Sequence, residues 1–562
     1  MADVDAELLR EAFLDPIRFA LLVDDEFPSY GTAAAAEDRV LSMVGLCRQK
    51  GWLCDVENDI EKILDIEAND HLHQSDLLIV DFHLDAAREN DASASIRLLQ
   101  RLAGSPHFNL AIIYTSGQPE AVALDVAFGL GGGVIATDDE AQAFAEAMEE
   151  REDEFVLEPS MQVLKGVVGD GSAIAALNAE KQRLARHQVR IPEALAAMAH
   201  CYFTSRMDAR TIALRPQGMT LTCETGAEVP WISTPNLFVA VVNKEVQPQD
   251  LIDRLVSALE AWNPTPLQVL VVQARASLER AGSTHDEAVL SSPLVQAGWL
   301  LNVLSSEPPE RARRLGDLYG QLFAGLAGQL TSTAGAFGAK VLGDAPVEDA
   351  LAGARTLSRL AEHTPDAHVF HAANEFLSST ACASDGRILP GLIFQTQLGK
   401  GAKQLWLCTT PSCDLVPGQS EGGWDGQIGP YKAVYAARLA PISEAELQAR
   451  LAQATYGRHL FLTIDGAPMA YEIADESKRQ TKLEVLFVGD DGRYTGGQFE
   501  GLIIRESEGK PAFKAATFRA LAQLRPGYAN KFLIDAGMQK ARIGLSWVGM
   551  QPPAVVVTPT PN

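Results

Sequence analysis

Two stretches decide the fold of the first part of this chain: Phe19-Ala-Leu-Leu-Val-Asp24-Asp25-Glu26 and Asp76-Leu-Leu-Ile-Val-Asp81. Each is a short apolar run that ends in carboxylates. Apolar runs of this length with polar flanks are typical of buried parallel strands. Ligands of open α/β sheets bind at the carboxyl ends of such strands. We therefore expect Asp24, Asp25 and Asp81 to converge at one sheet edge, where they suit a hard divalent cation and an aspartate nucleophile.

Strand-like and helix-like segments alternate up to about residue 130. Further strands are predicted at 52–56 and 109–115, and helices at 59–68 and 91–103. Regular alternation of this kind predicts a doubly wound parallel sheet with helices on both faces.

The rest of the chain is expected to form a mainly helical middle region and a C-terminal α+β domain. A strand-like piece at 237–242 interrupts the helical region, and a linker rich in Gly and Ala is expected at 335–345. In the C-terminal part, a helix is predicted at about 513–524, within a basic stretch that runs from Lys510 to Arg542. The predicted strands of this part are 404–408, 459–463 and 483–487, and the predicted division of the chain is 1–165, 166–345, 346–550 and a disordered tail at 551–562.

The composition is that of a globular protein, with 562 residues that are 47% hydrophobic and 21% charged. This length exceeds what a single core supports, so we expect several domains. No apolar run reaches the length of a membrane span, and the first residues lack the basic region of a signal peptide, so a cytoplasmic location is expected. The formal net charge of −26 makes nucleic acid an unlikely partner for the surface as a whole.

Few other residues suggest chemistry. The seven cysteines are scattered, and Cys408 and Cys413 lack a second pair at the spacing of zinc ligands, so a packed strand end is the favoured interpretation. His71 and His73 are expected to be solvated histidines of a surface loop. No nucleotide-binding fingerprint or hydrolase motif is present.

Roughly residues 17–160 resemble the receiver domain of two-component response regulators. Asp24 and Asp25 match the acidic pair that follows the first strand in that family. Asp81 matches its phosphoacceptor aspartate, and Thr115 matches the hydroxyl residue that ends its fourth strand. An isolated Asp-Asp pair is commonly a helix cap or a solvated turn, but three features in this order favour the receiver. The resemblance implies a five-stranded, flavodoxin-like α/β domain.

The resemblance also implies a function. Asp81 would accept a phosphoryl group from a partner histidine kinase, Thr115 would hydrogen-bond that group, and no enzymatic activity beyond self-phosphorylation is expected. Mg²⁺ would remove the repulsion between the carboxylate and the phosphoryl oxygens. Because packed carboxylates have raised pKa values without metal, Mg²⁺ binding should weaken at low pH. The implied Mg²⁺ ligands are Asp24, Asp25, Asp81 and the backbone carbonyl of His83.

One element of the family pattern is not found where it is expected. A lysine usually ends the fifth strand of a receiver and contacts the phosphoryl group. The segments considered for this strand are 133–136 and 155–158, and neither supplies a lysine, although Lys165 lies nearby. We therefore predict that phosphate is captured and that conventional switching is impaired.

A receiver without a recognisable output could act as a phosphate sink that competes with another response regulator for its kinase. The overall organisation resembles the large receiver-containing proteins of bacterial anti-phage two-component operons of the Detocs type. Two alternatives stay open. The chain could be a phosphorylation-controlled effector whose C-terminal domain binds protein or nucleic acid, or a pseudo-receiver that uses its sheet as a docking platform without phosphate.

Overall fold

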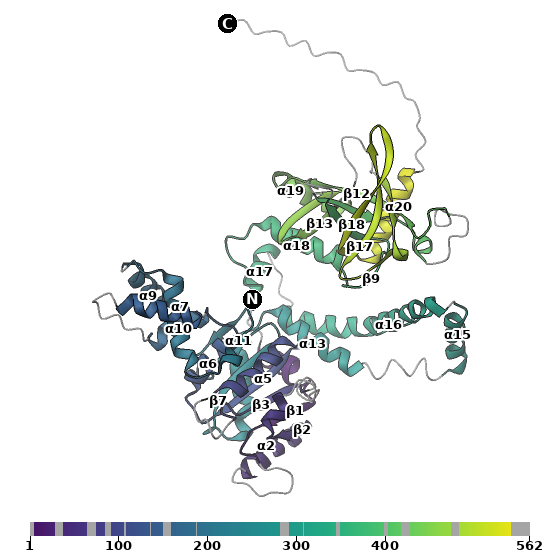
Figure 1. Cartoon of the computed structure of the whole chain (residues 1–562). Coiled ribbons are helices and arrows are strands. Elements are labelled where there is room, and N and C mark those ends of the chain that lie inside the picture. Colours follow the sequence, from purple (N-terminus) through teal and green to yellow (C-terminus); the bar gives the residue numbers. More distant parts are fainter. Residues whose placement is uncertain are drawn as a thin grey trace, which may run out of the picture. The chain divides into compact units, whose positions relative to one another are not determined.

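The computed structural model divides the chain into two compact units, Met1–Arg359 and Leu360–Asn562 (Figure 1), which are described separately. The predicted middle region, 166–345, belongs to the first unit. The residues that the structure describes are 5–27, 37–64, 75–84, 91–105, 108–134, 136–149, 159–186, 188–281, 292–306, 308–343, 349–397, 403–416, 427–473 and 483–540.

The first unit is built on a seven-stranded sheet in the order β2-β1-β3-β4-β7-β6-β5. The first five strands of this order are parallel, which confirms the predicted receiver-like α/β fold. β6 and β5 extend the sheet beyond β7 as an antiparallel hairpin. The strands are β1 Phe19–Val23, β2 Leu53–Glu57, β3 Leu77–Val80, β4 Asn109–Thr115, β5 Thr222–Glu224, β6 Trp231–Ser233 and β7 Leu237–Asn243.

Both faces of the sheet are covered by helices because successive strand residues point to opposite sides. Leu22 and Ile79 belong to a core with α1, η1, α2, α12 and α13, whereas Leu21 and Leu78 belong to a core with α3, α5 and α6. The first set of helices is α1 Ala6–Leu9, η1 Arg10–Leu14, α2 Glu37–Lys50, α12 Leu251–Trp262 and α13 Pro266–Ala281. The second set is α3 Ile60–Leu64, α5 Ser93–Gly104 and α6 Pro119–Gly129.

The fifth parallel strand is β7, so the predicted location of this strand was wrong. Residues 133–134 and 136 lie outside helices and strands, and 155–158 fall outside the described residues. The carbonyls of Gly132 and Gly133 accept hydrogen bonds from the Arg215 guanidinium at 2.8 and 3.1 Å. These carbonyls therefore bind a side chain and do not pair with a neighbouring strand. β7 instead carries six buried apolar residues and pairs with β4 along its length.

A large insertion therefore separates α6 from β7. Besides β5 and β6, the described residues of this insertion form five α-helices, and α8 and α10 contribute Leu164 and Phe203 to the core on the α6 side of the sheet. Arg206 follows α10 and forms a bidentate ion pair with the buried Asp125 of α6, with Nε 2.8 Å from Oδ1 and Nη2 2.7 Å from Oδ2. The helices are α7 Asp138–Glu149, α8 Met161–Val168, α9 Ile174–Arg186, α10 Ile191–Thr204 and α11 Ala209–Ala213.

Two helices extend beyond the core of the first unit. α16 (Pro308–Leu342) packs against α13 near its end, where Phe337 is buried, and it contacts α15 (Pro293–Leu304) near its start (Figure 1). Residues 335–342, predicted as a linker, form the last turns of α16. We call α15 together with residues 308–336 of α16 the arm. Within the described residues no helix is both long and apolar enough to span a membrane.

The second unit is rich in antiparallel sheet. β11, β10, β18, β17, β15 and β12 form a closed ring, because β11 also pairs with β12, and Phe394, Trp406 and Phe518 pack in one of its cores. The predicted strands at 404–408, 459–463 and 483–487 are confirmed. The strands are β8 Ser379–Ala381, β9 Gly386–Arg387, β10 Leu392–Gln397, β11 Lys403–Cys408, β12 Lys432–Ile442, β13 His459–Ile464, β14 Ala467–Glu472, β15 Leu483–Val488, β16 Arg493–Tyr494, β17 Gln498–Ser507 and β18 Lys510–Leu524, and the helices are α18 Asp366–Ser378, α19 Glu444–Leu451 and α20 Pro526–Lys540.

The helix predicted at 513–524 is wrong, because these residues form most of β18. Their alanines favour a helix, but β18 pairs with β17 from Lys510 to Arg519 and buries Phe518 completely. Tertiary pairing thus overrides local propensity. The predicted tail at 551–562, as well as His71 and His73, lie outside the described residues.

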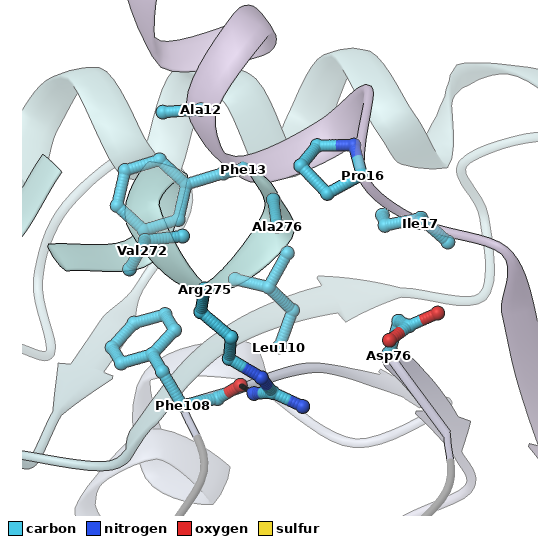
Figure 2. Close-up of a pocket in the computed structure, with 10 residues that line it drawn as sticks. All are labelled: Ala12, Phe13, Pro16, Ile17, Asp76, Phe108, Leu110, Val272, Arg275 and Ala276. Atoms are coloured by element: carbon cyan, nitrogen blue, oxygen red, sulfur yellow. Dashed lines mark hydrogen bonds between the residues drawn. The ribbon is translucent and has the colours of Figure 1, made fainter. Parts of the chain in front are cut away.

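A small pocket lies at the amino-terminal ends of β3 and β4 (Figure 2). Its lining includes Phe13, Pro16, Phe108 and Arg275, and its volume is about 40 Å³. The Arg275 guanidinium donates a hydrogen bond to the Phe108 carbonyl at 2.7 Å. Because the pocket adjoins the ends of the strands opposite to the acidic residues, it is separate from the predicted site.

Gly132→Ala tests whether packing of the insertion against α6 requires the backbone at Gly132 to lie close to the carbonyl groups around it. A Cβ at this position would lie 2.6 Å from the Val168 carbonyl oxygen and 2.7 Å from that of Ala127. We expect the free energy of unfolding to fall by about 1–3 kcal/mol, as in overpacked cores, in thermal or urea unfolding. Gly104→Ala is the matched control, since a Cβ there meets nothing within 4 Å. Equal stability of the two variants would contradict this prediction.

Candidate functional site

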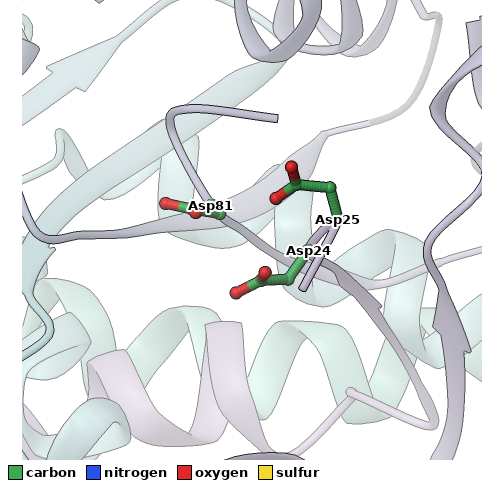
Figure 3. Close-up of side chains that lie close together, drawn as sticks. All are labelled: Asp24, Asp25 and Asp81. Atoms are coloured by element: carbon green, nitrogen blue, oxygen red, sulfur yellow. The ribbon is translucent and has the colours of Figure 1, made fainter. Parts of the chain in front are cut away.

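Three carboxylates meet at the carboxyl edge of the parallel sheet, as predicted. Asp24 and Asp25 follow β1, Asp81 follows the neighbouring β3, and one oxygen from each lies within 4.8 Å of the other two (Figure 3). Asp24 is 3% exposed and Asp81 is 8% exposed, whereas Asp25 is half-buried. Carboxylates this close in a buried site repel one another unless a cation lies among them or one of them is protonated.

The backbone explains why these side chains converge. The Asp81 amide donates to the Val23 carbonyl at 2.9 Å, which continues the β1–β3 ladder one residue beyond the apolar runs. Asp24 Oδ1 accepts a hydrogen bond from the Glu26 amide at 2.9 Å and so closes the turn after β1. The two runs that predicted the strands therefore also set the positions of the carboxylates.

Lys244 supplies a positive charge to this cluster. It is the residue directly after β7, and its amide donates to the Thr115 carbonyl at 2.7 Å. Its Nζ lies 2.9 Å from Asp81 Oδ2 and 3.2 Å from Asp24 Oδ2. The lysine that was predicted to be missing is therefore present, directly after β7 rather than after either of the two segments considered. Lys165, the substitute considered, instead pairs with Glu120.

Burial and charge pairing oppose each other in setting the pKa values of Asp81 and Lys244. Burial raises the pKa of Asp81 to about 6, although Lys244 opposes the shift. Burial works against protonated Lys244, but Asp81 and Asp24 outweigh it and raise the lysine's pKa. Because the pKa of Asp81 is higher folded than unfolded, ionising it costs stability as the pH rises from about 4 through about 6.

The residues present fit a divalent cation. With all carboxylates ionised, Asp24, Asp25, Asp81 and Lys244 carry a formal charge of −3 + 1 = −2. An all-oxygen set with an excess of two negative charges suits Mg²⁺. The backbone carbonyl of His83 as a further ligand stays a prediction.

Thr115 and His83 border the cluster. Thr115 ends β4, is fully buried, and its Oγ1 accepts a hydrogen bond from the Gly117 amide at 3.0 Å. A Cβ at Gly117 would lie 3.3 Å from Thr115 Oγ1 and 3.7 Å from His83 Cε1, so these groups adjoin one another. Burial, followed by the charges of Arg206 and Lys244, lowers the pKa of His83, which favours a neutral ring at pH 7.

Comparison with known proteins agrees with this geometry. Residues 16–160 match the model of the response receiver domain family. The N-terminal domain is a response receiver domain. No curated protein and no solved structure matches the chain. The family match ends before the insertion is complete, whereas the receiver sheet and its lysine continue to Lys244.

Sequence reasoning missed Lys244, although a signal for it existed. The run Leu237-Phe-Val-Ala-Val-Val242 has the same character as the runs before Asp24 and Asp81, and Asn243-Lys244 follows it directly. The fifth strand was sought within a short distance of the fourth. A lysine that ends a buried apolar run is the pattern that would have located it.

Mg²⁺ binding to the receiver should weaken as the pH falls through 6. Asp81 must be ionised to ligate a metal, and its pKa is raised to about 6. We expect the affinity measured by titration calorimetry to be roughly tenfold weaker at pH 5 than at pH 7.5. In Asp81→Asn the overall affinity for Mg²⁺ should be lower, and the difference in affinity between pH 5 and pH 7.5 should be smaller. A flat profile for the unaltered protein between these pH values would contradict the assignment.

Lys244→Ala should tighten Mg²⁺ binding. The Lys244 ammonium group repels a divalent cation bound among the carboxylates. Removing the ammonium group abolishes a repulsion worth about 1 kcal/mol or more, which corresponds to roughly fivefold in affinity. Lys244→Arg, which keeps the charge, is the matched control and should bind Mg²⁺ close to the original affinity. Weaker binding in Lys244→Ala than in Lys244→Arg would show that the lysine organises the carboxylates rather than competing with the metal.

Proposed function

We propose that Asp81 accepts a phosphoryl group from a phosphohistidine of a partner histidine kinase. The observation that carries this proposal is the pair of Asp81 oxygens: Oδ2 is held by Lys244, while the buried Oδ1 has no partner in the described structure. A carboxylate fixed through one oxygen presents the other to an incoming group. The match to the receiver family supports a two-component role.

The transfer balances without any further reactant. An Asp81 carboxylate oxygen attacks the phosphorus atom, the phosphorus–nitrogen bond of the phosphohistidine breaks, and the leaving nitrogen keeps the electron pair. When bound, Mg²⁺ supplies the positive charge that offsets repulsion between the carboxylates and the phosphoryl oxygens. Lys244 adds a fixed positive charge on the other side of Asp81. The product would be an aspartyl phosphate whose oxygens Lys244 and Thr115 would contact.

Lys244 also links the site to its surroundings. The Tyr114 hydroxyl donates to the Val246 carbonyl and lies 3.3 Å from the Lys244 carbonyl, so a backbone movement at Lys244 would disturb these contacts. The expectation of impaired switching rested on a missing lysine and therefore loses its basis. This link favours the second candidate function, a phosphorylation-controlled effector.

The role as a phosphate sink in an anti-phage pathway is the other specific form of the proposal. This role is supported by the position of β7, the strand that precedes Lys244. β7 lies between β4 and β6 and is therefore not a free sheet edge. Helices α8 and α10 of the insertion also share the core with α6. A receiver closed off in this way could hold phosphate in competition with another response regulator for the same kinase. The defence context rests on the resemblance in organisation.

Asp81→Asn should abolish phosphorylation. The protein, incubated with Mg²⁺ and a small phosphodonor such as acetyl phosphate, is expected to gain the mass of one phosphoryl group, whereas the variant gains none. Asp139→Asn, which alters an exposed carboxylate on α7, is the matched control and should be phosphorylated normally. No uptake by the unaltered protein would favour the pseudo-receiver, and uptake by Asp81→Asn would place the acceptor elsewhere.

Hydrogen exchange distinguishes the sink from the effector once uptake is established. A sink is expected to change exchange near Asp81, Thr115 and Lys244 and to leave residues 360–540 unchanged. An effector is expected to change exchange in that C-terminal unit as well. The same comparison in Asp81→Asn controls for effects of the phosphodonor itself.

A further inference from the structure

The arm exposes an apolar surface that its own unit does not cover. On α15, Leu294, Leu300 and Leu301 are exposed, the last to 68% of its surface. On α16, Tyr319 and Phe323 are exposed, Phe323 to 66%, and their rings stack on each other with centroids 6.5 Å apart. Exposed apolar side chains are common singly, but a contiguous set on adjoining helices indicates an interaction surface.

Most of the arm carries no charge, because its charged residues all lie in the first ten residues of α16. α15 contains no charged residue, and neither do the 22 residues of α16 between Asp317 and Lys340. A helix that is apolar on all sides is expected to be buried, yet in α15 Val303 is buried while most of its neighbours are exposed. These features indicate that the arm is covered in the functional protein.

Glycine makes α16 costly as an isolated helix. The helix contains six glycines, and each is about 1 kcal/mol less favourable than alanine in a helix interior. Near its end Phe337 is buried, and a Cβ at Gly338 would lie 3.4 Å from Leu270 of α13. Toward its start, a Cβ at Gly316, Gly320 or Gly328 would meet nothing within 4 Å. Packing must therefore stabilise the part of α16 that the first unit leaves uncovered.

These glycines form a ladder beside the row of large side chains. Gly316, Gly320, Ala324 and Gly328 are four residues apart and so share one face of the helix. Leu315, Tyr319 and Phe323 form a parallel row, shifted by one residue. In a two-fold pair of helices, the large row of one copy can lie over the ladder of the other, which permits close helix approach.

We propose that the arm is a self-association surface whose partner is the arm of a second copy of this chain. The α16 helices of the two copies would pack on each other, with α15 of each copy beside the start of its α16, and so bury the exposed apolar side chains of the arm. The uncharged part of the arm offers no charge pattern with which to select a different protein. Its large row and small ladder are instead complementary to those of an identical arm.

The size of the surface agrees with a reversible dimer. The uncharged part of α16 is about 33 Å long, α15 is about 18 Å long, and a helix is about 10 Å wide, which gives on the order of 500 Å² for each copy. Two copies would bury on the order of 1,000 Å², near the lower limit for specific interfaces. The proposal concerns assembly and does not depend on phosphorylation of Asp81.

Sedimentation velocity of the full chain over a range of concentrations tests this proposal. We expect a monomer–dimer equilibrium, and we expect Leu301→Glu and Phe323→Glu each to weaken the dimer at least tenfold. Leu53→Glu is the matched control, because Leu53 is a 72% exposed apolar residue on β2, away from the arm, and should leave the dimer unchanged.

Gly320→Leu separates loss of the interface from loss of folding. Leucine favours a helix over glycine and meets nothing in the monomer, so helix content by circular dichroism should be kept or raised while the dimer weakens. A chain that is monomeric at all concentrations would overturn the proposal, as would a dimer that withstands all three arm substitutions. If these substitutions leave self-association intact but abolish phosphoryl transfer from a kinase, the arm binds the kinase instead.

Discussion

The ion pair between Lys244 and the buried Asp81 and Asp24 is the interaction on which the site depends. It compensates carboxylates that would otherwise repel one another, and it fixes one oxygen of Asp81 while leaving the other without a partner in the described structure. It also joins parts of the chain that are far apart in sequence. The carboxylates belong to the segment that matches the receiver family, whereas the lysine follows an insertion that the match does not span.

The insertion changes the surroundings of the receiver more than its centre. It adds β5 and β6 to the sheet beyond β7 and packs helices against α6, while the order and direction of the five parallel strands follow the receiver pattern. The chemistry at the sheet edge can therefore be retained while the surface beside it is buried. A response to phosphorylation would have to pass through the packed insertion or through the loop after Lys244, to which Tyr114 is hydrogen-bonded.

The sequence predicted correctly those elements whose structure depends mainly on residues close to them in the chain. The apolar runs before Asp24 and Asp81 specify buried strands, and their carboxylates converge because parallel strands share one carboxyl edge. β7 and β18 could not be placed in this way. The partner of β7 depends on how a long insertion folds, and the alanines of β18 favour a helix until pairing with β17 outweighs them. Contacts distant in sequence decide both elements.

We propose that Lys244 completes the phosphoryl-acceptor site. A crystal structure of the full chain with Mg²⁺ and beryllium fluoride, an analogue of an aspartyl phosphate, would show whether it does. We expect the fluoride group on Asp81, a metal ion held by Asp24, Asp25 and Asp81, and the Lys244 ammonium group within hydrogen-bonding distance of a fluorine atom. Lys244 turned away from a loaded Asp81, or metal and fluoride bound elsewhere, would contradict it.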